Sequence, residues 1–200
     1  GAEVIIVPSQ GGVITPDLIP RLMTRARSLA EPDAFLTDQM NNPDSLNGYQ
    51  RLGAELLEQL GGFVTAFCAG VDTGGLLMGV ARALRHLPGH VRIVALEPAG
   101  SPILSGGQPG AHHVEGIGVG FVPPPLDVAQ FDEARGIDEA EARDMAGRLA
   151  AEEGIFAGTS TGLNIVGAVQ LAKELGPGHR VVTVACDSGL KYLSGDLFNE

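Results

Sequence analysis

Short runs of apolar, often β-branched residues alternate along the chain with longer segments in which apolar residues recur every three or four positions. The short runs, of strand length, cover residues 3–8, 63–69, 91–96 and 180–185. The longer segments, of helical period, cover residues 17–30, 48–60, 76–86, 138–153 and 161–175. Strands that alternate with helices form βα units, which pack into a mostly parallel sheet. The pattern therefore predicts an α/β fold with three layers, αβα.

Residues at the ends of these segments support the helix assignments. Thr15 is expected to cap the first helix, with Pro16 at its first position. The pair Gly61-Gly62 is expected to end the second helix. Residues 98–125 are rich in glycine and proline, and connections of this length inside a domain are usually functional or mobile.

The composition is that of a globular protein with one sizeable core. The chain has 200 residues, of which 44% are hydrophobic, so a single α/β domain is the default expectation. No apolar run approaches the ~18 to 20 residues that a membrane helix needs. No basic region precedes the first apolar stretch, as a signal peptide would require. We therefore expect a cytoplasmic protein that does not associate with membranes.

The net charge of −11 argues against a nucleic-acid-binding surface. Phosphate backbones are bound by clustered Lys and Arg, and the 13 such residues here are scattered along the chain. The expected partners are therefore small molecules or proteins. The pair His112-His113 has no further ligand at metal-binding spacing and is expected in a solvated loop.

Cysteine and lysine are both rare. Cys68 and Cys186 lie in apolar runs far apart in the sequence, so we expect both to be reduced core residues. Lys173 and Lys191 are the only lysines in the sequence. Chemistry that needs a Schiff-base lysine must therefore use one of these two side chains or go without.

A glycine-rich turn at residues 70–75, GVDTGG, connects a strand-like run to a helical segment. Glycines let the backbone approach a ligand closely, and the free N–H groups at a helix start favour an anion such as phosphate. The alternative is a tight connection without a ligand. The turn matches neither the GxGxxG fingerprint nor a P-loop, so nucleotide binding is disfavoured.

Two further glycine-rich stretches allow a structural and a functional interpretation. Residues 156–162, FAGTSTG, form another turn into a helix, in which Ser160 or Thr161 could act simply as a helix cap. Residues 116–121, GIGVGF, alternate glycine with apolar residues, which suits a backbone that lies against a flat ligand. The alternative for this stretch is a flexible loop.

The order of these segments resembles one enzyme family, the cysteine synthases (O-acetylserine sulfhydrylases). Seven segments follow one another as in that family: GAEVIIVP, DQMNNPDS, FCAGVDTGGLLMGVAR, VALEPAGSPILSGG, GIGVGFVP, EEGIFAGTSTG and DSGLKYLSGDLF. The likeness covers nearly the whole chain, and its last segment is nearer to cysteine synthases than to the related cystathionine β-synthases. The resemblance implies a tryptophan synthase β-like fold, pyridoxal 5′-phosphate as cofactor, and replacement of the acetate of O-acetylserine by sulfide to give cysteine.

The resemblance also implies cofactor-binding residues. A Gly-Thr-Gly-Gly-Thr turn holds the cofactor phosphate in the family, and it corresponds here to Asp72, Thr73, Gly74, Gly75 and Leu76. The first and last of these five, Asp72 and Leu76, depart from the family's turn. Ser160 corresponds to the serine that hydrogen-bonds the pyridine nitrogen.

Substrate-binding residues follow in the same way. Gln39 corresponds to the glutamine that helps to hold the substrate carboxylate, although Met40 replaces the usual phenylalanine next to it. Gly116, Ile117 and Gly118 are expected to lie against the bound ligand.

The family's Schiff-base lysine and its Ser/Thr-Gly-Asn loop precede the match to Gly1. We therefore expect residues 1–200 to be the large, C-terminal cofactor-binding domain with part of the adjoining small domain, truncated at the N-terminus and inactive alone. Neither lysine of the chain stands at the family's lysine position. The expected partners are an amino-acid substrate and either a second copy in a homodimer or a complementing N-terminal segment. The alternative is a non-catalytic relative that binds a phosphate ligand or a protein.

Overall fold

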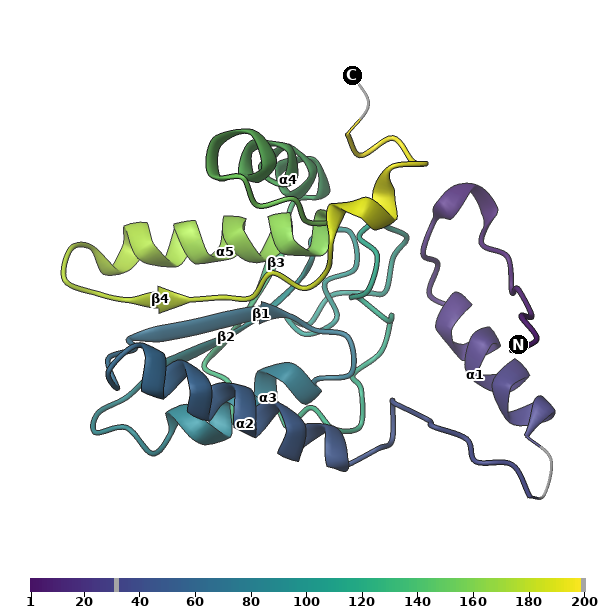
Figure 1. The fold of residues 1–200 in the computed structure, drawn as a ribbon, viewed down its shortest axis with the longest axis horizontal. Coiled ribbons are helices and arrows are strands. Elements are labelled where there is room, and N and C mark those ends of the chain that lie inside the picture. Colours follow the sequence, from purple (N-terminus) through teal and green to yellow (C-terminus); the bar gives the residue numbers. More distant parts are fainter. Residues whose placement is uncertain (31–32, 199–200) are drawn as a thin grey trace.

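The computed structural model describes residues 1–30 and 33–198, and these form a parallel four-stranded sheet between layers of helices (Figure 1). The strands are β1 (Ala66–Gly70), β2 (Arg92–Pro98), β3 (Glu133–Ile137) and β4 (Val181–Val182), in the order β3-β2-β1-β4. The α-helices are α1 (Leu18–Leu29), α2 (Asp44–Gln59), α3 (Gly75–Leu84), α4 (Glu139–Glu153) and α5 (Thr159–Leu175). Three 3₁₀ turns cover Gln10–Gly12, Val128–Gln130 and Gly189–Tyr192. No helix of the described residues is long and apolar enough to cross a membrane.

The helices cover both faces of the sheet, so the three-layer αβα prediction is confirmed. α2 and α3 lie on one face, and α5, with α4 packed against it, lies on the other (Figure 1). Each face has its own apolar core. Phe67 and Ile93 belong to the cluster on the α3 side, whereas their neighbours Cys68 and Val94 belong to the cluster that contains Leu163 of α5. Strands that are buried on both faces read as continuous apolar runs, which is why the sequence pattern predicts β1 and β2 correctly.

Two strand predictions differ from the structure, and one strand, β3, has no counterpart among the predictions. Residues 3–8 form no strand in the described chain, and Val4 and Ile6 are 79% and 80% exposed. A strand needs a neighbour that pairs with its backbone groups, and no described strand lies beside this segment. β3 is not predicted because its sequence, EARGI, contains no apolar run. It lies at the edge of the described sheet, where it pairs with β2, so it need not be apolar on both faces. β4 is shorter than its predicted range, 180–185.

Helix ends follow the capping signals in part. Gly61 and Gly62 have φ angles of 61° and 71°, in the left-handed region, just after the end of α2 as predicted. The prediction that Thr15 caps α1 is wrong. The helix begins at Leu18 after Asp17, and the Thr15 hydroxyl instead donates a hydrogen bond to the Asp17 carboxylate at 2.6 Å.

Residues 1–30 and 33–43, which include α1, lie beside the αβα layers (Figure 1). Ile14 forms an isolated antiparallel bridge with His112, with N–H···O distances of 2.7 and 3.1 Å. α1 and residues 36–40 border a largely apolar groove of about 340 Å³. This segment is therefore attached to the αβα layers without being part of their core.

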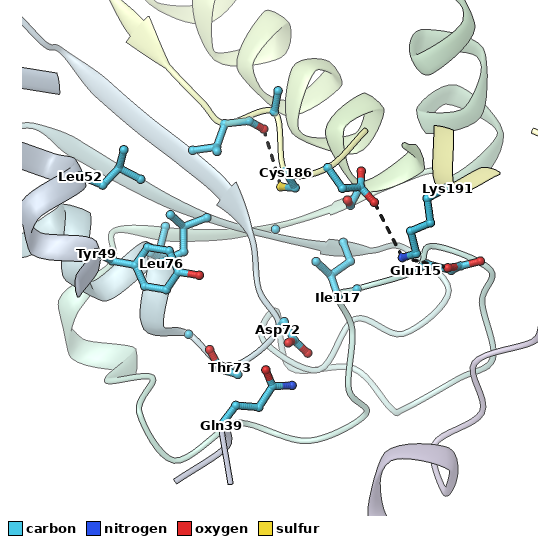
Figure 2. A pocket seen from close by; sticks show the side chains of 18 residues that line it. Gln39, Tyr49, Leu52, Asp72, Thr73, Leu76, Glu115, Ile117, Cys186 and Lys191 are labelled. Carbon is cyan, nitrogen blue, oxygen red and sulfur yellow. Dashed lines mark hydrogen bonds and ion pairs between the residues drawn. The ribbon is translucent and has the colours of Figure 1, made fainter. Parts of the chain in front are cut away.

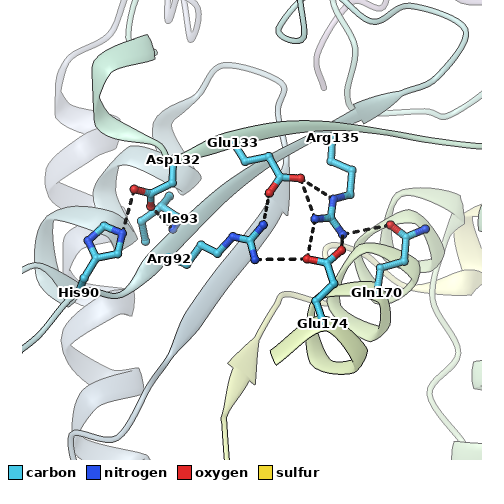
Figure 3. Close-up of polar contacts among 8 residues, drawn as sticks. All are labelled: His90, Arg92, Ile93, Asp132, Glu133, Arg135, Gln170 and Glu174. Atoms are coloured by element: carbon cyan, nitrogen blue, oxygen red, sulfur yellow. Dashed lines mark hydrogen bonds and ion pairs between the residues drawn. The ribbon is translucent and has the colours of Figure 1, made fainter. Parts of the chain in front are cut away.

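A network of charged side chains joins the end of α5 to β2 and β3 (Figure 3). Arg135 contacts Glu133 at 2.7 Å and Glu174 at 2.8 Å, and Arg92 pairs with the same two carboxylates. The Arg135 side chain is only 14% exposed, and the carboxylates of Glu133 and Glu174 compensate its charge at the edge of the sheet. Hydrogen bonds from Arg135 are the main cause that lowers the pKa of Glu174.

This lowered pKa predicts an acid-dependent contribution to stability. A carboxylate whose pKa is lowered by folding stabilises the native state above its ordinary pKa, and the contribution is lost as the pH falls through the lowered value. We therefore expect Glu174→Gln to reduce the free energy of unfolding at pH 7 and to have a smaller effect near pH 3, as measured by urea unfolding. Glu153→Gln, on an exposed residue of α4, is the control and should change neither value. An equal loss for Glu174→Gln at both pH values would contradict the prediction.

Candidate functional site

A cavity of about 350 Å³ lies at the ends of β1 and β4, where α3 and α5 begin (Figure 2). Open α/β sheets commonly bind ligands beyond the carboxyl ends of their strands. Eight of the ten predicted site residues line this cavity: Gln39, Asp72, Thr73, Gly74, Leu76, Gly116, Ile117 and Ser160. The structure therefore brings together segments that are far apart in the sequence, while their binding roles remain predictions.

The turn between β1 and α3 has the geometry of an anion site. Gly74, with φ 82°, takes a left-handed conformation before the first residue of α3. The N–H of Gly75 donates to the Thr73 hydroxyl at 3.2 Å, and the other N–H groups of the first helical turn have no acceptor within the helix. Gly75 is buried and does not line the cavity, and a Cβ atom there would lie 2.9 Å from the Ser45 hydroxyl. Its role is to let α3 pack closely against the start of α2.

Asp72 is the exception in this turn. Its side chain lines the cavity near Gln39 (Figure 2). Loss of hydration on burial raises the pKa of Asp72 to about 6. An acidic side chain therefore stands where the chain otherwise offers hydroxyl and N–H groups to a ligand.

Ser160 lies across the cavity in the first turn of α5 and is 4% exposed. Neither Ser160 nor Thr161 caps this helix, since α5 begins at Thr159 after Gly158 without a side-chain cap. The Thr161 hydroxyl instead accepts a hydrogen bond from the backbone N–H of Cys186 at 3.0 Å. The capping interpretation of these hydroxyls is thus wrong, and Ser160 lines the cavity.

Asn164, one turn further along α5, holds the cavity walls together. It is fully buried, and its Oδ1 accepts a hydrogen bond from the N–H of Gly70 at 2.7 Å. Its Nδ2 donates to the carbonyl of Val184 at 2.9 Å and to Sγ of Cys186 at 3.3 Å. One side chain therefore fixes the end of β1 and the segment after β4 to the same helix. In the sequence, an asparagine inside a helical segment carries no signal of its partners, so Asn164 is not among the predicted site residues.

Gln39 and the glycine-rich stretch border the cavity from the other side. Gly116 and Ile117 line it, whereas Gly118 lies behind it, with its N–H donating to Val71 and its carbonyl 2.9 Å from Nε2 of His112. His112 is 2% exposed, so the prediction of a solvated loop is wrong for this residue. Nδ1 of its ring accepts a hydrogen bond from a backbone N–H, which fixes Nε2 as the donor to Gly118 in the neutral ring, and burial lowers its pKa.

The segment after β4 supplies further polar residues that are not among the predicted site residues. Lys191 lines the cavity, with Nζ 3.2 Å from Glu115 and 3.8 Å from Asp187 (Figure 2). Asp187 also accepts hydrogen bonds from the Tyr192 hydroxyl at 2.7 Å and from the N–H of Gly158 at 3.2 Å. Lys191 is considered in the sequence only as a substitute Schiff-base lysine, and its two carboxylate partners become visible only in the fold.

Cys186 is exposed, so the prediction that both cysteines are core residues holds only for Cys68. The chain leaves the sheet after Val182 and passes along the cavity, which places Cys186 beside Ser160 and Asn164. A hydrogen bond from Ser160 favours the thiolate of Cys186, but desolvation is the larger effect and raises its pKa.

These environments predict that one thiol per chain reacts with a water-soluble aromatic disulfide reagent. Cys68 is 0% exposed and burial raises its pKa to about 11, so it should react only after unfolding. The accessible thiol of Cys186 should react slowly at pH 7 and faster toward pH 9, since the thiolate is the nucleophile. Cys186→Ser should abolish the reaction of the folded chain and Cys68→Ser should leave it unchanged. Two rapidly reacting thiols in the folded chain would contradict this assignment.

The cavity suits pyridoxal phosphate in size and in most of its polar groups. Its volume lies within the range of about 300 to 1,000 Å³ that is usual for small-molecule sites. The glycine turn at the start of α3 suits a phosphate, and the buried hydroxyl of Ser160 suits a ring nitrogen. The Asp72 carboxylate, when ionised, is the one group of the turn that opposes an anionic ligand.

Comparisons with known proteins agree with this arrangement. The family described as "Pyridoxal-phosphate dependent enzyme" matches residues 1–187. A cysteine synthase of Staphylococcus aureus is 39% identical over 202 residues, which covers 100% of this chain and 63% of that protein. A probable cysteine synthase of Bacillus subtilis is 37% identical over 205 residues and is covered to 64%. The chain thus spans less than two thirds of the length of these curated relatives.

Solved structures show the same fold. A cysteine synthase from Entamoeba histolytica superposes with a TM-score of 0.83 at 29% identity, covering 92% of this chain and 55% of that one. An O-acetylserine dependent cystathionine β-synthase from Helicobacter pylori superposes with a TM-score of 0.80 at 36% identity, covering 90% and 58%. The tryptophan synthase β-like fold that the sequence resemblance implies is therefore confirmed. In sequence and in fold, this chain belongs to the family of pyridoxal-phosphate-dependent enzymes.

Proposed function

We propose that residues 1–200 form the larger, cofactor-binding part of a cysteine synthase that replaces the acetate of O-acetylserine by sulfide. The observation that carries this proposal is the cavity that joins the glycine turn at α3 to Ser160 at α5. Pyridoxal 5′-phosphate would supply the electron sink for the reaction. The protein would supply anchoring, orientation and exclusion of water.

The residues of the chain divide these tasks. Thr73 and the N–H groups at the start of α3 would bind the phosphate, and Ser160 would hydrogen-bond the pyridine nitrogen. A hydroxyl cannot keep that nitrogen protonated as a carboxylate would, which suits elimination and replacement at the β carbon. Gln39 would help to hold the substrate carboxylate, and Gly116 and Ile117 would lie against the ligand.

We further assign residues 44–200 to the large domain and the preceding segment, with α1, to part of an adjoining small domain. Val4 and Ile6 are exposed, and the groove beside α1 is largely apolar. Surfaces of this kind usually mark contacts with another segment or subunit. The chain alone should therefore be inactive and should be completed by an N-terminal segment, in a homodimeric enzyme. Two free cysteines are in keeping with a location in the cytoplasm.

Two measurements test the proposal. Pyridoxal 5′-phosphate titrated into the chain should bind, with an absorbance change that Ser160→Ala alters and the exposed control Ser194→Ala does not. Cysteine should form from O-acetylserine and sulfide only after addition of the part of the Staphylococcus aureus relative that this chain does not cover. A mixture that neither binds the cofactor nor forms cysteine would refute the proposed function.

Two alternatives have distinct outcomes in the same assay. A cystathionine β-synthase, the activity named for the Helicobacter pylori neighbour, would accept a thiol amino acid in place of sulfide. A non-catalytic relative would bind a phosphate ligand without any turnover in the completed mixture. The carboxylate of Asp72 in the phosphate turn is the observation that favours this second alternative.

A further inference from the structure

Asp72 lines the cavity within the glycine turn that the proposed function assigns to the phosphate. It follows β1 and precedes Thr73 and Gly74, directly before the N-terminus of α3. Within the part of the chain that the structure describes, its carboxylate accepts no hydrogen bond and pairs with no cation (Figure 2). The side chain is therefore free to face a ligand.

The other groups around the cavity do not compensate its charge. Glu115 comes from the loop before the glycine stretch, Asp187 and Lys191 come from the segment after β4, and Gln39 is uncharged. Lys191 is the sole cation that lines the cavity among the described residues, and Glu115 and Asp187 already surround its ammonium group. Three carboxylates and one ammonium group leave the cavity with a formal charge of −2 when Asp72 is ionised.

The following inference rests on the proposed function and specifies its phosphate site. We propose that Asp72 is a specificity-determining residue, and that the turn binds a phosphate ester together with one proton, which the Asp72 carboxylate takes up. The proton comes from solvent and converts the carboxylate to a carboxylic acid, and no bond of the ligand changes. The acid no longer repels the phosphate, and its O–H can donate a hydrogen bond to a phosphate oxygen.

The size of the effect follows from the desolvated state of this side chain. The pKa of Asp72 is about 6. If the acid form alone accepts the phosphate, about 3% of the chains are competent at pH 7.5, and the apparent affinity is about thirtyfold lower than in acid. The second ionisation of a phosphate ester also occurs at about pH 6. The decisive quantity is therefore the ratio of the wild-type affinity to the Asp72→Asn affinity at each pH. Titration of the ligand affects both affinities equally and cancels in this ratio.

Calorimetry of pyridoxal 5′-phosphate binding to the chain tests the proposal. Titrations at about pH 5.5, 6.5 and 7.5, each in two buffers of different ionisation enthalpy, give both the affinity and the number of protons taken up. Asp72→Asn should bind about thirtyfold more tightly than wild type at pH 7.5 and about equally at pH 5.5. On binding, this variant should also gain fewer protons than wild type, by at most one. Asp72→Gly, which restores the glycine of the family's turn, should behave in the same way. Asp144→Asn, an equal charge change on an exposed residue of α4, should match wild type. Pyridoxal, which lacks the phosphate, should show no such difference.

The outcomes separate this inference from the proposed function. Equal affinities and equal proton uptake for wild type, Asp72→Asn and Asp72→Gly at every pH would overturn the role of Asp72 and leave cofactor binding standing. Absence of binding in all of these variants, including Asp72→Gly, would overturn the proposed cofactor site and this inference with it. If Asp144→Asn gains as much affinity as Asp72→Asn, or more, the effect comes from net charge and the inference is overturned.

Discussion

Replacement of Asn164 by leucine is expected to lower the free energy of unfolding by about 2 to 3 kcal/mol, because it removes the partner of the Gly70 N–H and leaves the Val184 carbonyl only a weak thiol contact from Cys186 at 3.8 Å. Each such group costs about 1 to 3 kcal/mol when it is left unpaired. The segment after β4 should also loosen, since β4 pairs with β1 over only two residues. Urea unfolding measures the first effect, and faster reaction of the Cys186 thiol measures the second.

Val169→Ala, on an exposed position of the same helix, is the matched control for this change. It should alter stability by less than about 0.5 kcal/mol and leave the thiol reaction unchanged. If Asn164→Leu is as stable as wild type, the amide does not hold the two strand ends together, and the cavity walls depend on backbone pairing alone.

Replacement of Gly74 by alanine should weaken ligand binding strongly. An alanine at φ 82° is strained by about 1 to 2 kcal/mol, and its Cβ would lie 2.8 Å from Cβ of Leu126. The turn must shift to relieve both problems, which moves the N–H groups at the start of α3. We expect the affinity for pyridoxal 5′-phosphate to fall at least tenfold, which corresponds to about 1.4 kcal/mol.

Gly147→Ala provides the control, because a Cβ atom at this position of α4 would meet no atom within 4 Å. Alanine is the better helix former, so this variant should be as stable as wild type or more stable by up to about 1 kcal/mol, with unchanged affinity. Calorimetry at pH 5.5, where the Asp72 effect is smallest, gives the cleanest comparison. Unchanged affinity of Gly74→Ala would mean that the turn does not contact the phosphate.

Much of the site can be predicted from local sequence, because its parts are turns with their own chemistry. The turn that contains Thr73 and Gly74, between β1 and α3, carries glycines and a hydroxyl, and so does the connection from α4 to α5 that contains Ser160. The turn after β1 lies at the carboxyl edge of the parallel sheet, as the fold class predicts. The start of α5 follows α4, so its position beside that turn is decided by the tertiary structure. Asp72 is likewise visible in the sequence as a departure from the family's turn.

Other features depend on contacts between distant segments. His112 is buried because its ring bridges the backbone of its own loop, and Cys186 is exposed because the chain leaves the sheet after two paired residues. Residues 3–8 have the composition of a strand and yet form none, since a strand requires a neighbour to pair with. Local composition reports how well a segment suits a conformation, and it does not report whether a partner is present.

The sequence by itself determined the αβα class, the succession of β1, α3 and β2 along the chain, the family, and the residues of the glycine turn. These follow from hydrophobic periodicity and from turn residues, which act over a few positions. Only the tertiary structure decided that Asn164 joins β1 to the segment after β4 and that Lys191 is enclosed by Glu115 and Asp187. It also decided that Asp72, in the cavity, has no partner among the described residues. These properties depend on hydrogen bonds, hydration and charge between side chains and backbone groups that meet only when the chain is folded.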